Sequence, residues 1–378
     1  MDPPGHAAHL ASLAAHVARL VPLADEARAE THAAPDEGLR WRSRARLALR
    51  RNDDGVFQVS HYSNEAGGYV RTEDFEDVNA PRIVEVVAKF AEVLPAYPAL
   101  ADAVESCRVL VGRASNQAVL NVFVTHNATA IPKETEQVAA QLMPDVALIV
   151  RTSGEVVHAV GNDTVLETYR LSDGRNLQYY HIENFFSNPS RSGAEATLDW
   201  LCRQCIKLTA GRSEDARMLE LYCGCGTHTV ALAPFFGEIV AVELHPRLVD
   251  AAQVNVNANA AANDARAKEL GRMHAAQVDV VAAPSATFCR RMGRRAAFDV
   301  LLVDPPRCGL DKDTIRLAAR FSHVLYISCC VENLARDVAA LASTHEVTER
   351  AVIDHFPMTR WVETAVVLRR RVYSHPVL

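Results

Sequence analysis

Short apolar runs alternate with segments of helical periodicity in the second half of the chain. Strands buried on both faces read as near-continuous apolar runs, and helices between such strands allow them to pair in parallel. The pattern therefore predicts an α/β fold with a parallel, doubly wound sheet of the Rossmann-like kind. The expected strands are residues 218–224, 238–244, 275–281, 298–306 and 323–328.

Two further strand patterns close the chain, at residues 347–356 and 361–371. Too little chain separates them for a helical crossover, so we expect them to pair antiparallel at the edge of the sheet. A parallel sheet with such an antiparallel addition resembles the architecture of S-adenosylmethionine-dependent methyltransferases.

The first half of the chain has a different pattern. Residues 7–20 have the spacing of an amphipathic helix, and strand-like stretches then follow in close succession. This arrangement predicts an α+β domain with mostly antiparallel pairing. The polar stretch at 170–180 is the expected seam, so we predict one domain over residues 1–178 and a Rossmann-like domain over residues 179–378. The expected elements of the first domain are strands at 40–49, 56–62, 107–113, 118–126 and 146–152, and helices at 81–94 and 132–143.

Composition narrows the class of protein. The 378 residues suffice for two domains, and 49% hydrophobic with 23% charged residues is typical of a soluble globular protein. No apolar run reaches the ~18 residues that cross a bilayer. The nine cysteines are odd in number and mostly late in the chain, which argues against a secreted disulfide framework. We therefore expect a cytoplasmic monomer with no membrane contact.

One basic stretch stands out against a net charge of −6. Residues 40–51, RWRSRARLALRR, hold six arginines and no acid. On a strand, alternate positions share one face, so Arg40, Arg42, Arg44 and Arg46 would point the same way and could contact phosphates. The alternative is a solvated edge strand that its charges protect from aggregation.

A glycine-containing loop follows the first strand of the second half. In LELYCGCGTHTVALA (219–233), Gly224 and Gly226 would let a ligand approach the backbone where doubly wound folds bind cofactors. Glu243, at the end of the next strand, can accept both ribose hydroxyls of a nucleoside cofactor. The alternatives are an ordinary strand–helix turn and an acidic residue at a helix start.

Two strand ends carry reactive groups. In LLVDPPRCGLD (301–311), two prolines fix Asp304 at the sheet edge, and Arg307 stands where amino-methyltransferases have a base-stacking aromatic residue. In VLYISCCVENLARD (324–337), Cys329 and Cys330 are adjacent, which makes a poor metal clamp because neighbouring side chains diverge. One of them is therefore a nucleophile, or both are small buried hydrophobic residues.

With these motifs the chain resembles the RNA 5-methyluridine methyltransferases, and most closely the tRNA (uracil-54-C5)-methyltransferases. Weaker similarity to the family's sequence pattern occurs in the arginine stretch and at residues 115–123. The resemblance is densest over 183–368 and rests on several motifs in one order. They are ENFFSNPS (183–190), LELYCGCG (219–226), AAQVNVNANAAAN (251–263), VDPPRCGLD (303–311), YISC (326–329) and DHFPMTRWVET (354–364).

The resemblance implies a role for each matching residue. Cys329 would be the nucleophile that adds to C6 of uracil, Glu363 the base that removes the C5 proton, and Asp304 would hold the uracil edge. The implied cofactor is S-adenosylmethionine. Its expected contacts are Asn188, Tyr222, Gly224, Gly226, Thr227, Glu243 and Asp304.

The implied partner is tRNA, bound at its T-arm by an RNA-binding domain over residues 1–178. Ribosomal-RNA relatives typically carry a four-cysteine iron–sulfur site, whereas Cys107 alone precedes Cys202 here, so we expect no metal and no cluster. CRQC (202–205) lies in a helical pattern and is weak evidence for metal.

Three departures from the family pattern keep other functions open. Asn188 replaces Gln, Trp361 replaces a common His, and Cys330 with Val331 replaces Asn-Pro. A non-catalytic tRNA-binding or folding factor on the same fold is the first alternative. A ribosomal-RNA uridine methyltransferase is the second, and a small-molecule methyltransferase would leave the arginines unexplained.

Overall fold

The computed structural model describes residues 5–25, 27–35, 39–52, 57–63, 68–71, 75–126, 128–211, 216–292 and 298–372. Backbone contacts divide the chain into two compact units. The larger unit comprises residues 1–38, 169–179 and 192–378, and the smaller unit comprises residues 39–168 and 180–191.

An eight-stranded sheet forms the centre of the larger unit. Five neighbouring strands pair in parallel, from β15 through β14, β11 and β12 to β13, and β17 runs antiparallel to both β15 and β16. The expected Rossmann-like sheet with antiparallel closing strands is confirmed, but β1 rather than a closing strand forms the edge on that side. In sheet order the strands are β1 (Arg28–His32), β16 (His345–Ile353), β17 (Glu363–Arg370), β15 (His323–Ser328), β14 (Val300–Val303), β11 (Arg217–Leu221), β12 (Glu238–Glu243) and β13 (Gln277–Ala282).

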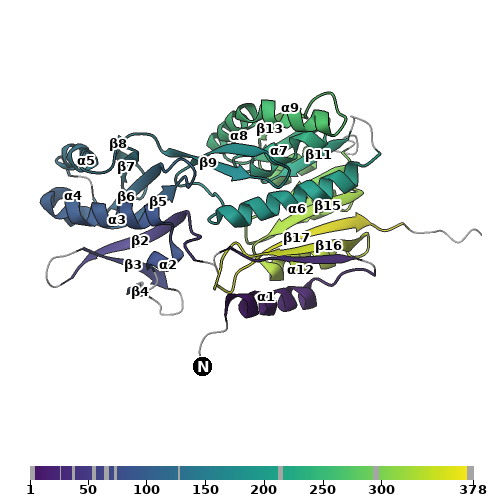
Figure 1. Ribbon diagram of the computed structural model, residues 1–378, viewed down its shortest axis with the longest axis horizontal. Helices are drawn as coiled ribbons and strands as arrows, with labels where there is room; N and C mark the ends of the chain where they lie inside the picture. Colours follow the sequence, from purple (N-terminus) through teal and green to yellow (C-terminus); the bar gives the residue numbers. More distant parts are fainter. Residues whose placement is uncertain are drawn as a thin grey trace, which may run out of the picture. The chain divides into compact units, whose positions relative to one another are not determined.

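Helices cover both faces of this sheet, and Figure 1 shows α6 and α1 on opposite sides of it. Each face has its own apolar cluster, because buried strands present apolar side chains alternately to the two sides. On one face lie α6 (Arg191–Thr209), α7 (Thr227–Leu232), η3 (Ala233–Phe235), α8 (Pro246–Ala258) and α9 (Ala260–Glu269). On the other lie α1 (His6–Leu20), α10 (Ser285–Arg291), α11 (Lys312–Ala318) and α12 (Val331–Leu341).

The start of the chain does not follow the expected domain division. Helix α1 buries Leu10 and Val17 in the second cluster of the larger unit, and β1 pairs in parallel with β16. Residues 1–38 therefore group with the Rossmann-like half, whereas we expected the boundary between residues 178 and 179. An apolar helix face can be recognised locally, but the sequence does not name the surface that covers it.

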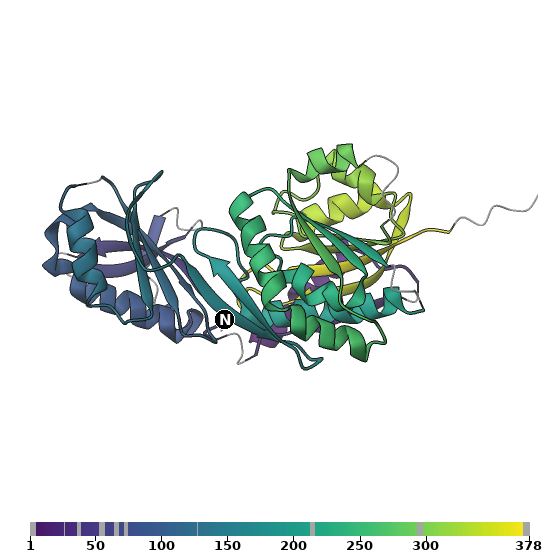
Figure 2. The same cartoon turned by 90° about the horizontal axis from the view of Figure 1, so that it is seen from above.

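A seven-stranded sheet, mostly antiparallel, forms the smaller unit, as its α+β pattern predicts. One apolar cluster joins α3, α4 and α5 to a single face of the sheet, and Figure 2 shows these blue helices along that side. In sheet order the strands are β4 (Gly68–Arg71), β3 (Phe57–Ser63), β2 (Arg44–Arg51), β5 (Val104–Val111), β6 (Ala118–Val124), β7 (Val146–Arg151) and β8 (Val156–Val160). The helices are α2 (Phe75–Val78), α3 (Pro81–Val93), η2 (Leu94–Ala96), α4 (Pro98–Ala103) and α5 (Ile131–Ala139).

The expected seam at residues 170–180 forms part of a two-stranded sheet of β9 (Thr164–Arg170) and β10 (Asn176–Ile182). The chain passes between the two units within these strands. No helix among the described residues is long and apolar enough to cross a membrane.

Candidate active site

Strand register brings the three expected catalytic residues to one edge of the larger sheet. Strands β14 and β15 are parallel, so Asp304 and Cys329, which follow their last residues, lie at the same edge. Strand β17 runs the opposite way, with Thr364 opposite Ser328, so Glu363 at its start lies opposite Cys329. Three side chains that are far apart in sequence thus meet at the carboxyl ends of parallel strands, where doubly wound folds place their sites.

The thiol of Cys329 is half-buried among charged groups. Burial and the carboxylates of Glu363 and Asp304 raise its pKa to about 11, while the Arg307 guanidinium acts in the opposite direction. The guanidinium carbon of Arg307 lies 4.2 Å from the ring centroid of Trp361. Arg307 is the cation that favours the thiolate, a role for which the sequence contains no motif.

Cys330 faces a different environment. Its sulfur lies 3.5 Å from Oε2 of Glu332 and accepts a 3.3 Å hydrogen bond from Nδ2 of Asn333, both in the first turn of α12. Its backbone N–H donates to Ser328 Oγ at 3.2 Å. The two adjacent cysteines therefore diverge, as expected for neighbours at a strand end.

The carboxyl groups of Glu363 and Asp304 both have raised pKa values. Burial, reinforced by the charge of Asp304, raises the pKa of Glu363 well above its ordinary value. Burial raises the pKa of Asp304 to about 6. A like charge disfavours ionisation, so the charge of Asp304 makes Glu363 keep its proton to higher pH.

A buried imidazole lies near this pair. Nδ1 of His228 is 3.6 Å from Oε1 of Glu220, whose other oxygen accepts a 2.5 Å hydrogen bond from Thr229 Oγ1. Burial lowers the pKa of His228, but the nearby carboxylate of Glu220 and the charge of Asp304 outweigh it, so the net shift is upward. Neither residue was expected, although a glutamate within the apolar strand β11 is a signal that could have been noticed.

The loop after β11 has the backbone that its glycines predict. Gly224 and Gly226 have φ of +57° and +78°. A Cβ at Gly226 would lie 3.1 Å from Cβ of Ala252 in α8, whereas a Cβ at Gly224 would meet nothing within 4 Å. The first glycine thus leaves open space beside the loop, and the second permits close helix packing.

Glu243 joins this loop to the end of β12. Its Oε2 accepts the backbone N–H of Gly224 at 3.0 Å, and its Oε1 accepts that of His245 at 2.9 Å. Each carboxylate oxygen keeps a further lone pair that can accept a hydroxyl. With the open space at Gly224, these residues fit the adenosyl part of a nucleoside cofactor.

The remaining expected cofactor contacts are placed as follows. Tyr222, with φ of +64°, has its hydroxyl 3.4 Å from Oδ2 of Asp311. Thr227 opens α7 and accepts a 3.0 Å hydrogen bond from Tyr179 Oη at its carbonyl. Asn188 is half-buried in the smaller unit, and its role stays a prediction.

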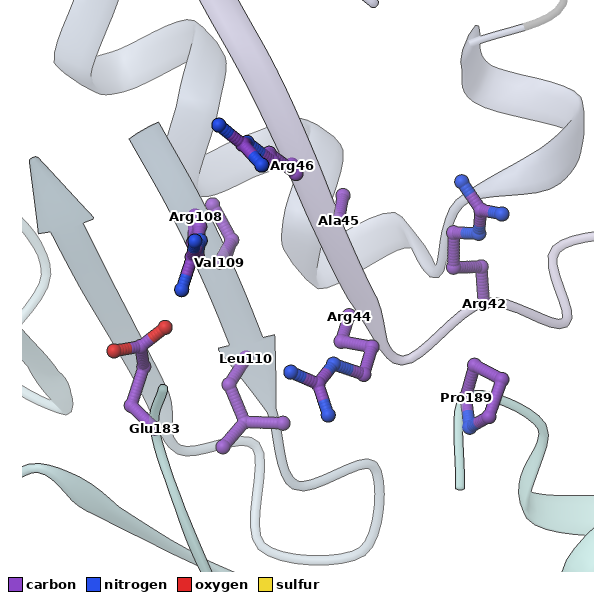
Figure 3. A pocket seen from close by; sticks show the side chains of 9 residues that line it. All are labelled: Arg42, Arg44, Ala45, Arg46, Arg108, Val109, Leu110, Glu183 and Pro189. Carbon is purple, nitrogen blue, oxygen red and sulfur yellow. The ribbon is translucent and has the colours of Figure 1, made fainter. Parts of the chain in front are cut away.

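The arginine stretch is only partly a strand. β2 begins at Arg44, and Arg40 has φ of +50°, so the expected alternation does not extend to Arg40. Arg42, Arg44 and Arg46 line one pocket of the smaller unit together with Arg108, which lies outside the arginine stretch (Figure 3).

A family model described as tRNA (Uracil-5-)-methyltransferase matches residues 6–371. The chain belongs to the tRNA (uracil-5-)-methyltransferase family. In this family member the matched range includes residues of both units, so the smaller unit is part of what the family shares.

Curated relatives agree with this family. The tRNA/tmRNA (uracil-C(5))-methyltransferase of Stutzerimonas stutzeri is 30% identical over 374 residues, which cover 98% of this chain and 99% of that protein. That of Aromatoleum aromaticum is 40% identical over 239 residues, 62% of this chain. In the latter match the chain spans 61% of the relative's length.

A solved structure supports the fold of the family member. The crystal structure of Pyrococcus abyssi tRNA (uracil-54, C5)-methyltransferase in complex with S-adenosyl-L-homocysteine matches with a TM-score of 0.68 and 19% identity. The match covers 96% of this chain and 83% of that chain.

The cysteines of this methyltransferase family member are unpaired, and six are buried. Cys202 and Cys205 pack in the core on α6, and Arg175 Nη2 donates to Cys202 Sγ at 3.4 Å. Within the described ranges, no group of three or more His, Cys, Asp or Glu side chains could hold a metal ion.

Proposed function

We propose that the chain methylates C5 of uridine 54 in the T-loop of tRNA, with S-adenosylmethionine as methyl donor and Cys329 as covalent nucleophile. The observation that carries the proposal is the meeting of Cys329, Glu363 and Asp304 at one sheet edge. Family membership and the names of the curated relatives support uracil C5 in tRNA as the target.

Tyr222, Gly224, Thr227 and Glu243 would hold the cofactor, with the two oxygens of Glu243 accepting the ribose hydroxyls. The Pyrococcus abyssi enzyme was crystallised with S-adenosyl-L-homocysteine, which is what remains of S-adenosylmethionine after methyl transfer, and this supports a cofactor of the same kind here. When bound, S-adenosylmethionine supplies an electrophilic methyl group on its sulfonium.

The first chemical step is nucleophilic addition. The thiolate of Cys329 forms a bond to C6, the C5=C6 π electrons move toward C5 and O4, and C5 becomes nucleophilic enough to take a methyl group. Arg307 favours this step because its charge lowers the pKa of the thiol against the effect of burial. Ionised Asp304 would accept the N3–H of the ring and so hold its edge.

Elimination completes the reaction. Glu363 takes the C5 proton, the electrons of that bond restore C5=C6, and the C6–S bond breaks to release the Cys329 thiolate. A raised pKa makes Glu363 a stronger base once it is ionised. The proton that Glu363 retains must leave first, so the rate is expected to rise with pH.

The second candidate is a non-catalytic tRNA-binding factor, which the departures at Asn188, Cys330, Val331 and Trp361 favour. Such a factor would bind tRNA but would not transfer a methyl group to it. The contacts of Cys330 with Glu332 and Asn333 in α12 argue against Cys330 as the nucleophile, since they engage its thiol outside the group formed by Cys329, Glu363 and Asp304.

The test uses unmodified tRNA and radiolabelled S-adenosylmethionine. The labelled nucleoside should be 5-methyluridine. A tRNA transcript with cytidine at position 54 should receive no labelled methyl group. With 5-fluorouridine tRNA the protein should form an adduct stable in denaturing gels, because fluorine cannot leave as a proton does.

The twin cysteines give this test a matched control. Cys329→Ala should abolish both methylation and trapping, whereas Cys330→Ala should retain most of both. Loss of activity in Cys330→Ala with an active Cys329→Ala would show that the nucleophile is misassigned. Binding of tRNA without methylation or adduct in the unaltered protein would establish the non-catalytic factor.

A further inference from the structure

Four arginines surround a pocket of about 340 Å³ within the smaller unit. Arg42, Arg44 and Arg46 come from the stretch at the start of β2, Arg108 comes from β5, and Glu183 is the one carboxylate in the lining (Figure 3). Arg44, Arg46 and Arg108 alternate along β2 and β5 with Ala45, Leu47 and Val109, which belong to the apolar core on the helix-covered face. The pocket therefore lies on the sheet face opposite the helices.

The position of β2 removes the simplest explanation for its charges. Arginines on an edge strand discourage aggregation, but β2 lies between β3 and β5 in the interior of the sheet. Moreover, Arg46 is the direct cross-strand partner of Arg108. Like charges in directly opposite positions destabilise a sheet. The pair of Arg46 and Arg108 therefore lowers the stability of the sheet, which suggests a role other than stabilising the fold.

The guanidinium groups of Arg44 and Arg108 are held in place without being neutralised. Nη1 of Arg44 donates to the carbonyls of Phe185 at 2.8 Å and Ser187 at 3.3 Å. Arg108 donates to Oδ1 of Asn184, and its guanidinium carbon lies 4.8 Å from the ring centroid of Phe123. None of the four arginines forms an ion pair with any of the described residues.

Glu183 offsets this charge only in part. It is 3% exposed, and its Oε2 accepts a hydrogen bond from Nδ2 of Asn121. Its carboxylate forms no ion pair with Arg44 or Arg108 within the described part of the chain, although its charge acts on both. Four cations facing one anion leave a strong positive potential in an open hollow.

We propose that this pocket binds a phosphodiester group of the RNA substrate, at the pair formed by Arg46 and Arg108. The proposal rests on the proposed function, from which it takes the RNA as the source of phosphate. Planar guanidinium groups match the oxygens of a phosphate, and a pocket that contacts phosphate positions the RNA without reading its bases.

The first test compares Arg46→Gln and Arg108→Gln with Arg50→Gln, an exposed arginine of β2 outside the pocket. Either pocket variant should weaken tRNA binding and reduce the slope of log affinity against log salt by roughly 0.7–0.9 for each lost contact. The control should change neither. Because each pocket variant also removes a repulsive pair, its Tm should stay equal or rise. Unchanged salt slopes, or a fall in Tm that accounts for the lost affinity, would overturn the proposal.

The second test uses the opposite charge change. Glu183→Gln removes the carboxylate from the lining while keeping an oxygen that can accept from Asn121. It should tighten tRNA binding severalfold, opposite in sign to the arginine variants. Weaker binding in Glu183→Gln would mean that the carboxylate orders the pocket and that a free positive potential is not what binds RNA.

The outcomes separate this proposal from the proposed function. If the unaltered protein methylates tRNA but pocket variants bind it normally, the pocket proposal fails and the function stands. If the unaltered protein does not bind tRNA, both fail. In that case, a rise in Tm with inorganic phosphate that Arg108→Gln abolishes would assign the pocket to a free phosphate instead.

Discussion

The guanidinium carbon of Arg307 lies 4.2 Å from the ring centroid of Trp361, within the range of a cation–π interaction. This contact gives a role to a residue that departs from the family pattern, because the indole can hold the cation that acts on Cys329. A second guanidinium, that of Arg360, has its carbon 4.7 Å from the centroid of the same ring.

Arg307→Ala is therefore predicted to raise the pKa of the Cys329 thiol, and Arg360→Ala is the matched control. The rate of Cys329 alkylation by iodoacetamide, followed by mass spectrometry of its peptide across pH, reports this value. Arg307→Lys should restore part of the effect, because it keeps the charge but loses the planar stacking. Equal alkylation profiles in all variants would mean that Arg307 does not act on the thiol.

Glu363→Gln is predicted to stall the reaction after methyl transfer. Addition by Cys329 and methylation of C5 do not require the carboxylate, whereas release of the enzyme needs a base for the C5 proton. The variant should accumulate a methylated protein–tRNA adduct from ordinary uridine, seen in denaturing gels with label from the methyl donor. Cys329→Ala in the same background should show no adduct. Normal turnover by Glu363→Gln would require another base.

Glu243→Ala should weaken S-adenosylmethionine binding by roughly 1–3 kcal/mol, the range for lost hydrogen bonds to a charged group. Calorimetry of cofactor binding measures the effect, and tRNA affinity, which should be nearly unchanged, is the internal control. Glu243 also accepts two backbone N–H groups, so Glu243→Gln, which keeps an acceptor, tests whether loop order alone explains the loss. Unaltered cofactor affinity in the alanine variant would show that the ribose is placed wrongly.

Gly226→Ala and Gly271→Ala form a matched pair for stability. Both glycines have φ of +78°, so each substitution costs about 1–2 kcal/mol of left-handed strain. Only at Gly226 does the new Cβ approach Ala252, at 3.1 Å, while Gly271 has nothing within 4 Å. Thermal unfolding should show the larger loss of Tm in Gly226→Ala. Equal losses would mean that α8 moves away at no cost.

The raised pKa of Asp304 predicts how its substitution depends on pH. Because burial raises this pKa to about 6, the stability associated with the neutral carboxyl is present at acid pH and is lost as pH rises through 6. Asp304→Asn should therefore raise Tm at pH 8 and change it little near pH 4. Asp313, whose pKa the hydrogen bond from Arg290 lowers, should behave oppositely, since Asp313→Asn removes stability at pH 8. If the difference in Tm between Asp304→Asn and the unaltered protein were the same at pH 4 and pH 8, this account would be contradicted.

Local pattern was sufficient for much of this fold. The strands of the larger sheet and their alternation with helices follow from apolar runs of a few residues, because burial on both faces leaves a signature within each strand. The groups at the strand ends were also predictable, since parallel pairing brings their carboxyl ends to one edge. Asp304, Cys329 and the Gly224 loop needed no knowledge of distant contacts.

Other features were decided by contacts between distant parts of the chain. Helix α1 and β1 joined the larger unit because their partners, an apolar cluster and β16, come from much later in the chain. Arg307 and His228 gained roles from the charges that surround them in the fold. The arginine stretch looked equally like an edge strand or a phosphate site until sheet order placed β2 in the interior, with Arg108 opposite Arg46. A sequence records which face of a strand is charged, but only long-range pairing determines what lies across from it.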